Sequence, residues 1–333
     1  MNRLNQILVV LLVLQLVVAA IILVPRPAPA GEGESLYPDV EADRIVGLTI
    51  TDAQGETLQL AKHEGTWVLP GADDYPVPAD KVPPVLAKLA ALQAERLVTE
   101  TPGSHNRLKV ADDEFERLVE FELEDGSRYR LYVGTSPSYS VTHVRAEGQD
   151  EVYLTSELSL QDVGAAASTW VDRTYLDLPS DQIVALTVEN QNGTLDLRNI
   201  GEAGWMLTDQ AEDETLDQGT VTSLANRTAT ITLLEPLGQE EKPEYGMDNP
   251  SAVVTIRTHN EEDGEDQVYT LWVGAQNPED NSYVIRSSES PYYIRVSEFS
   301  VQDLVEYTRD DLLELPPTPT PSTSGAQGTP ESP

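Results

Sequence analysis

Four histidines, two acidic clusters and two of the four tryptophans are the residues of this 333-residue chain that could support chemistry. The histidines are His63, His105, His143 and His259. None of them forms an H-x-x-x-H or H-E-x-x-H pair, the spacing with which one helix face holds zinc, so we expect no metal site at them. The chain also lacks cysteine, a G-x-S-x-G segment and a glycine-rich phosphate loop. Thiol catalysis, cysteine-ligated metals and the hydrolase nucleophile elbow are therefore excluded.

The acidic segments 261–266 (EEDGED) and 71–80 (GADDYPVPAD) offer oxygen ligands for calcium. EEDGED lacks the alternating acidic residues of a calcium-binding loop and the glutamate six residues after its glycine. Its Asp-Gly pair lies between two β-like segments and predicts a hairpin turn. The second segment predicts a solvated loop that leads into a helix capped by Asp80. Paired carboxylates for glycoside cleavage stay open, because their separation is a distance in three dimensions.

Trp67 and Trp205 could stack on sugar rings, but they occupy the same place in a repeated strand. That placement favours core anchors. Gly134 and Gly274 each end a strand and predict a turn there. We therefore expect no catalytic residue, no cofactor-binding residue, no metal ligand and no cofactor.

The sequence segments that must position these residues occur twice in the chain. The segment 156–163 (SELSLQDV) returns as 297–304 (SEFSVQDL), and 43–50 (DRIVGLTI) returns as 181–188 (DQIVALTV). The strand end LYVG returns as LWVG, and all offsets lie between 137 and 141 in an unchanged order. Such a period is far longer than the ~20–50 residues of solenoid repeats, so each copy is a whole domain.

The pattern inside each copy predicts an α+β domain, a mainly antiparallel sheet with one longer and one short helix. Alternating apolar residues at 129, 131 and 133 predict a strand with one buried face. Apolar residues at 82, 86, 89, 92 and 97 predict the longer helix of copy one, which ends near Gly103. Its counterpart in copy two starts at Asp217, continues through Ile231 and ends near Gly238.

The repeated phrase predicts the short helix of each copy. Ser156 and Ser297 stand at the capping positions. The residues expected to point inward are Leu158 and Val163 in copy one, and Phe299 and Leu304 in copy two.

The N-terminal segment 7–24 (ILVVLLVLQLVVAAIILV) has Gln15 as its only polar side chain and predicts a single-pass transmembrane helix. At ~1.5 Å per residue it spans about 27 Å, close to the hydrocarbon thickness of a bilayer. A signal peptide cleaved after Ala30 is the open alternative. Both place the acidic bulk of the chain outside the cytoplasm, at the cell membrane.

The sequence thus predicts six regions. They are a short cytoplasmic N-terminus (1–6), a transmembrane anchor (7–24), a linker (25–42), repeat one (43–179), repeat two (180–316) and a disordered Pro/Thr/Ser tail (317–333).

The charge balance is strongly acidic, with 57 acidic and 21 basic residues and a net charge of −36. Nucleic acid is not an expected partner, because its binding requires cations that neutralise phosphates. Anionic lipid surfaces are disfavoured for the same reason. Basic proteins, cations or neutral surfaces are the expected partners.

Copy two carries YGMDNP (245–250), LWVG (271–274) and YYI (292–294), in that order. These phrases resemble the family known as domain of unknown function 4340. Copy one departs from the pattern, with HNRLKVADDEF (105–115) in place of YGMDNP. The resemblance covers about 43–316 and implies an N-terminal membrane helix, a duplicated α+β region and an accessory role beside ABC-type transporters of the gliding-motility kind. It implies no catalytic residues.

We therefore expect a membrane-tethered extracytoplasmic interaction module that supports an ABC-type transporter or envelope complex and is not an enzyme. An exposed apolar patch would favour this interpretation. The alternative is an extracytoplasmic saccharide- or cation-binding protein that uses the groove between the repeats.

Overall fold

The computed structural model describes residues 33–139, 141–260 and 264–314. The anchor predicted at 7–24 and the tail predicted at 317–333 lie outside the described residues, as does Ala30. Within the described ranges, no helix is both long and apolar enough to cross a bilayer.

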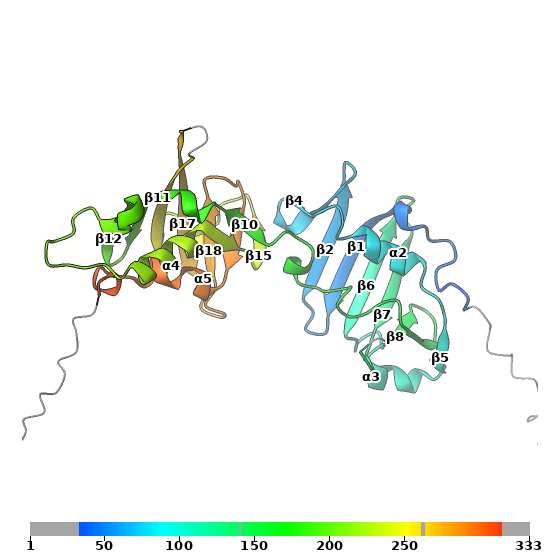
Figure 1. Cartoon of the computed structure of the whole chain (residues 1–333). Helices are drawn as coiled ribbons and strands as arrows, with labels where there is room; N and C mark the ends of the chain where they lie inside the picture. Colours follow the sequence, from blue (N-terminus) through cyan, green and yellow to red (C-terminus); the bar gives the residue numbers. More distant parts are fainter. Residues whose placement is uncertain (1–32, 140, 261–263, 315–333) are drawn as a thin grey trace, which may run out of the picture. The chain divides into compact units, whose positions relative to one another are not determined.

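The chain forms two compact units (Figure 1). Of the described residues, those from 33 to 69 and from 76 to 170 belong to the first, while 70–75 and those from 171 to 314 belong to the second. The sequence repeat and the structural units do not divide at the same residue. The strand β10 (Thr174–Asp177) pairs with β14 (Thr230–Thr232) inside the second unit.

The first unit contains a nine-stranded sheet in the order β4-β3-β2-β1-β6-β7-β8-β9-β5, antiparallel from β3 to β5. Its strands are β1 (Ile45–Asp52), β2 (Thr57–His63), β3 (Thr66–Leu69), β4 (Tyr75–Pro76), β5 (Arg96–Thr99), β6 (Arg117–Leu123), β7 (Arg128–Val133), β8 (Thr142–Ala146) and β9 (Val152–Thr155).

One end of β7 is buried on both faces, which differs from the predicted alternation. Leu131 and Val133 are buried as expected, but Tyr132 between them is buried too. Tyr132 belongs to a second cluster with Leu108, Val110 and Val152. These residues cover the face of β7 that carries Tyr132, and the periodicity of a single strand does not reveal contacts with distant segments.

The second unit repeats this strand order in an eight-stranded antiparallel sheet, β13-β12-β11-β16-β17-β18-β19-β15. Its strands are β11 (Ile183–Asn190), β12 (Gly193–Asn199), β13 (Trp205–Leu207), β15 (Glu235–Gly238), β16 (Ala252–His259), β17 (Asp266–Gln276), β18 (Tyr283–Ser287) and β19 (Tyr293–Val296). In sheet order, each of the eight strands that follow β4 in the first sheet has a counterpart at the same place in the second sheet. The two α+β sheets are therefore copies of one topology.

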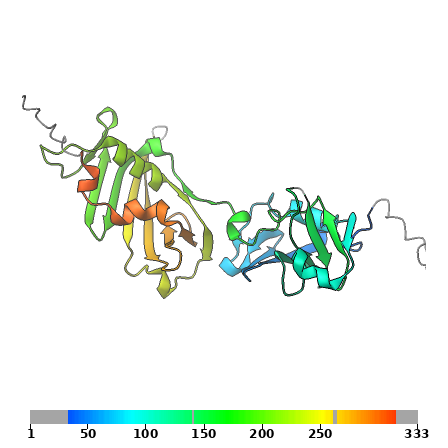
Figure 2. The same ribbon diagram turned by 90° about the horizontal axis from the view of Figure 1, so that it is seen from below.

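The helices are α2 (Pro83–Ala90) and α3 (His105–Leu108) in the first unit, and α4 (Gln218–Ala229) and α5 (Glu298–Glu306) in the second. In the second unit, α4 and α5 contact each other and lie across one face of the sheet (Figures 1 and 2). The predicted cap of α4 is confirmed, because the Asp217 carboxylate accepts hydrogen bonds from the backbone N–H groups of Gly219 and Thr220.

The predicted start and end of the helix in copy one are wrong. Asp80 does not cap α2, which begins at Pro83. A proline at the first helical position has a suitable fixed φ and lacks an N–H group that would otherwise be unpaired. The helix ends at Ala90 because residues 92–94 pair with the extended segment 34–36, through Leu36 N to Leu92 O and Ala94 N to Glu34 O.

The predicted continuation of both helices is replaced by strands. Leu97, expected on the helix, lies in β5 and is 48% exposed. In copy two, Ile231 lies in β14 and Gly238 in β15. Both predicted helix ends near Gly103 and Gly238 were therefore too late.

The repeated phrase folds in two ways. In copy two it forms α5, with Ser297 at the cap position, but the Ser297 side chain accepts no hydrogen bond from a backbone N–H of the helix. In copy one, 156–163 is a turn without a helix, which contradicts the predicted short helix and its cap at Ser156. Leu158, Val163 and Leu304 are buried as expected, whereas Phe299 is 72% exposed. Helical spacing explains this, because Val301, Leu304 and Val305 form the buried face of α5 and leave Phe299 outside it.

Candidate functional site

The aspartate shared by the two repeated phrases forms the same ion pair in both units. In the first unit, Asp162 Oδ1 lies 2.6 Å from Nζ of Lys88 on α2. In the second, Asp303 Oδ2 lies 2.6 Å from Nη1 of Arg227 on α4. The phrase was therefore duplicated together with a structural contact that ties it to the longer helix of its own unit.

Close packing requires the glycines Gly134 and Gly274. Gly134 directly follows β7, whereas Gly274 lies inside β17, so the predicted strand end is wrong for Gly274 and the predicted turn geometry is wrong for both. Neither Gly134 nor Gly274 has a positive φ. A Cβ at Gly134 would overlap the Leu108 carbonyl oxygen and would lie 2.6 Å from Val110 Cγ1. A Cβ at Gly274 would likewise overlap the Tyr245 carbonyl oxygen.

This packing shows which residues of copy one replace the YGMDNP motif. The residue after Leu108 is Lys109 with φ 58°, and the residue after Tyr245 is Gly246 with φ 67°. In both units a left-handed residue turns the chain so that the preceding carbonyl faces a glycine, Gly134 in the first and Gly274 in the second. The LKV of copy one (108–110) is thus the counterpart of YGM (245–247), with the backbone retained and the side chains changed.

The histidines form local contacts. His105 Nε2 lies 3.0 Å from the Asp150 carbonyl oxygen, and His143 Nδ1 lies 2.7 Å from that of Thr135. His259 Nδ1 lies 2.7 Å from Asp266 Oδ1, and His63 is exposed. Among the described residues, no three or more histidine, aspartate or glutamate side chains are placed to hold a metal ion.

The tryptophans and the EEDGED segment, the remaining candidates from the sequence, have structural roles. Trp67 and Trp205 are each 7% exposed, which confirms them as core anchors. The predicted hairpin turn at EEDGED is confirmed between β16 and β17, where Gly264 has φ 71° and donates its N–H to Asn260 O at 2.8 Å. Residues 261–263 of that turn lie outside the described part.

Arg145 on β8 is a polar centre that was not predicted from the sequence. It is 4% exposed, and its guanidinium lies 4.3 Å from the centre of the Tyr132 ring. Nε donates to Val110 O at 2.6 Å, Nη1 to Gln149 O at 3.1 Å and Nη2 to the Asp112 carboxylate. The hydrogen bond from Arg145 lowers the pKa of Asp112. An arginine between apolar residues in the strand THVRA was the signal in the sequence.

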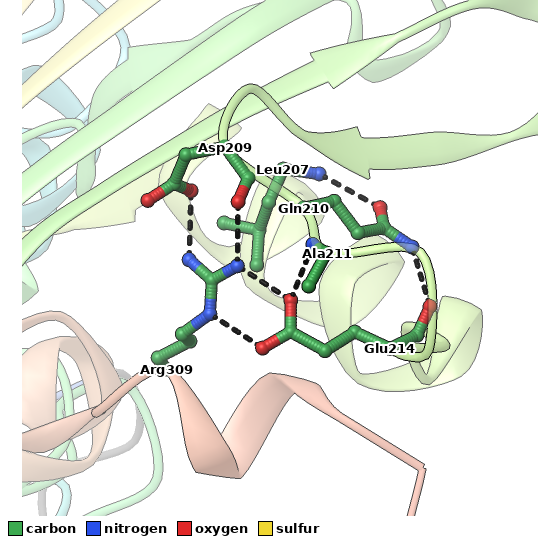
Figure 3. Close-up of polar contacts among 6 residues, drawn as sticks. All are labelled: Leu207, Asp209, Gln210, Ala211, Glu214 and Arg309. Carbon is green, nitrogen blue, oxygen red and sulfur yellow. Dashed lines mark hydrogen bonds and ion pairs between the residues drawn. The ribbon is translucent and has the colours of Figure 1, made fainter.

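Arg309 holds two carboxylates in the second unit (Figure 3). Nε and Nη2 donate to the two Glu214 oxygens at 3.0 and 2.6 Å, and Nη1 donates to Asp209 Oδ1 at 2.7 Å. Nη2 also donates to the Asp209 carbonyl at 3.0 Å. The Arg309 guanidinium lowers the pKa of Glu214 to about 2 and also lowers that of Asp209. A general acid needs a raised pKa, so this carboxylate pair does not suit glycoside cleavage.

The loop that carries these carboxylates is also bonded to itself. Gln210 accepts from Leu207 N at 3.3 Å and donates to Glu214 O at 2.9 Å, while Ala211 N donates to Glu214 Oε2 at 2.9 Å (Figure 3). Beside the loop, Asp217 N donates to Leu312 O and Glu314 N to Thr215 O. Arg309 and these backbone hydrogen bonds together hold the segment 309–314 against the loop before α4.

Acid is expected to weaken the ion pair between Arg309 and Glu214. The folded-state pKa of Glu214 is about 2 and its ordinary value is 4.5, so its stabilising contribution is complete above pH 4.5 and is lost as the pH falls toward 2. We expect the amides of Asp217 and Glu314 to lose protection from hydrogen exchange between about pH 5 and about pH 3, after correction for intrinsic exchange rates.

Glu214→Gln serves as the control for this effect. In this variant the amides of Asp217 and Glu314 should be less protected at about pH 5 than in the unmodified protein. Their protection should also change much less on acidification. An unchanged acid response in Glu214→Gln would show that another group governs this region.

One edge of the first sheet is open among the described residues. β5 ends the strand order and pairs only with β9. The register shifts between Leu97 and Thr99, so Val98 has no partner in β9. Leu97 is 48% and Val98 38% exposed.

The two units define a class of protein with a tandem α+β domain whose duplicated features, an ion pair and a glycine junction, are structural. A family model for a domain of unknown function, DUF4340, matches residues 67–250 and 205–317. The two matches begin 138 residues apart (205 − 67), each at one of the repeated tryptophans. The chain belongs to this family. No curated protein and no solved structure matches it.

Proposed function

We propose that this chain is a membrane-tethered extracytoplasmic interaction module that supports an ABC-type transporter or envelope complex and catalyses no reaction. The observation that supports this best is the open edge strand β5 with its exposed apolar residues. Most sheet edges are protected from association by charges, proline or a covering segment. Arg96 is the only charged residue of β5.

An open edge recruits a partner by strand addition. An extended segment of the partner supplies backbone hydrogen bonds along the edge, and its side chains pack on Leu97 and Val98. The net charge of −36 favours a partner segment that also carries basic residues. The tether raises the local concentration of the module beside membrane proteins to about millimolar, so a weak contact suffices.

Site-specific crosslinking in native membranes tests the proposal. The full-length chain carries a photo-crosslinking amino acid at Val98 or, as the control, at Val268, which is 53% exposed in the second unit. We expect position 98 to capture a transporter or envelope-complex subunit and position 268 to capture little of it. In addition, Leu97→Asp should reduce the yield at position 98 by about fivefold or more, because a charge disrupts packing along the added strand.

Equal yields at the two positions would overturn the proposal. So would an unchanged yield in Leu97→Asp, provided that circular dichroism shows the variant to be folded. The saccharide- or cation-binding alternative in a groove between the repeats stays a prediction.

A further inference from the structure

A pocket of about 530 Å³ lies at one end of the second sheet. The turn between β11 and β12, the segment before β16, the facing ends of β17 and β18, and α5 form its walls. Among its lining residues are Glu189, Asn249, Ser251, Gln276, Tyr283 and Val305. Asn249 and the neighbouring Pro250 complete the YGMDNP motif, to which the proposed function assigns no role.

Tyr283 is the largely buried polar group of this pocket. It is 7% exposed, and its hydroxyl has no hydrogen bond to any other residue in the described ranges. Burial raises its pKa, and the charges of Glu298 and Glu306 raise it further, so the hydroxyl is neutral at physiological pH. The hydroxyl oxygen itself is not enclosed, because Arg117 Nε is the only buried side-chain polar atom without a partner among the described residues, so the hydroxyl is free to bond a ligand in the pocket.

Three of the polar side chains around the pocket already donate hydrogen bonds within the protein. Gln276 Nε2 donates to Asn281 O and to Glu298 Oε1, at 3.4 and 3.3 Å. The Asn190 amide donates to two backbone carbonyls of the α5 region, each at 3.0 Å. Ser251 Oγ donates to Gly274 O at 2.8 Å. The groups left for a ligand include the Gln276 carbonyl oxygen and the Glu189 carboxylate as acceptors, beside the Tyr283 hydroxyl and the side-chain amides of Gln191 and Asn249, which can accept or donate.

The charge of the lining indicates the sign of the ligand's charge. Among the described residues, Glu189 is the one charged residue that lines the pocket, and neither lysine nor arginine does so. Glu298 and Glu306 add negative potential close to the Tyr283 ring. A complementary ligand group is positively charged and rich in N–H donors.

We propose that this pocket binds a guanidinium or primary ammonium group, carried by a basic side chain of a peptide or by a free organic amine. The charged head contacts Glu189 and the free acceptors, while its aliphatic stem packs on Val253 and Val305. The site lies in the second unit and does not depend on the β5 edge of the proposed function.

Binding is measured by titration calorimetry with the full-length chain in detergent micelles, at near-physiological salt to screen the general acidity of the surface. The probes are N-acetyl-arginine amide, the uncharged N-acetyl-citrulline amide of similar shape, agmatine and maltose. We expect the arginine amide to bind with a Kd of about 1 mM or lower, and the citrulline amide about tenfold more weakly or not at all.

Three variants separate the pocket from the acidic surface. Glu189→Gln should weaken arginine-amide binding by about fivefold, and Tyr283→Phe, which leaves the charge unchanged, by about threefold. Glu202→Gln, an exposed carboxylate outside the pocket, should leave it unchanged. Tighter binding of the arginine amide than of agmatine would indicate a peptide source, and the reverse order a free amine; either supports the proposal.

Equal binding of the arginine and citrulline amides would overturn the proposal. Binding of maltose without the cations would also overturn it and would favour a saccharide site. Equal loss in Glu189→Gln and Glu202→Gln, with none in Tyr283→Phe, would show that the cations bind the acidic surface at large. Crosslinking at Val98 is a separate readout, so this proposal and that of the β5 edge can fail independently.

Discussion

Gly134→Ala is expected to destabilise the first unit by about 3 kcal/mol or more. The added Cβ would meet the carbonyl oxygens of Leu108 and Lys109 and Cγ1 of Val110, all closer than 3.0 Å. Two of these atoms belong to the backbone of a turn that follows α3, so a side-chain rotation cannot relieve the clash. The turn must move, and it would carry with it the Leu108 and Val110 side chains that cover Tyr132.

Denaturant unfolding followed by hydrogen exchange, which reports on each unit separately, measures this effect. Gly103→Ala is the matched control in the same unit, because its Cβ would meet nothing within 4 Å and its φ is not positive. We expect it to change stability by less than about 1 kcal/mol. Gly274→Ala should destabilise the second unit as Gly134→Ala does the first. A loss in Gly134→Ala no larger than that in Gly103→Ala would refute the packing argument.

Arg145→Met is expected to cost the first unit about 3 kcal/mol. It leaves the carbonyls of Val110 and Gln149 without their donor and removes the cation from the Tyr132 ring. Arg145→Lys should recover little of the loss, because one ammonium cannot reach three acceptors that the planar guanidinium contacts from Nε, Nη1 and Nη2. Urea unfolding of the first unit measures both variants.

Arg128→Met is the control for Arg145. Arg128 also pairs with a carboxylate, that of Glu122, but its side chain is 76% exposed, and such pairs contribute at most about 1 kcal/mol. Acid supplies a second test, of the ion pair between buried Arg145 and exposed Asp112. The pKa of Asp112 is lowered in the folded protein, so its contribution is present above the unfolded-state pKa and is lost as the pH falls through the folded-state value. Full stability in Arg145→Met would contradict the assigned role.

The glycine junction also explains how copy one can depart from the family pattern without losing the fold. Both copies retain a left-handed residue followed by an apolar side chain that reaches the packed glycine: Val110 reaches Gly134, and Met247 reaches Gly274. Glycine accommodates the left-handed φ at little cost, whereas Lys109 is strained there. Copy one therefore retains the geometry with a less favourable residue.

The sequence by itself determined the duplication, the α+β class, the two tryptophan anchors and the Asp217 cap. Each depends on local pattern or on order along the chain, which a repeat at a fixed offset preserves. It also predicted the hairpin at EEDGED, because an Asp-Gly pair between β-like segments has few other uses.

Only the tertiary structure decided the helix ends, the two folds of the repeated phrase and the reason for Gly134 and Gly274. Apolar periodicity continued past Ala90, but pairing of 92–94 with 34–36 redirected the backbone into a strand. Phe299 and Leu158 occupy equivalent places in the sequence, yet α5 forms in one unit and a turn in the other. The contacts of Arg145 and the pocket beside Tyr283 are likewise assembled from segments distant in sequence, and distances across a fold are not encoded in spacing along the chain.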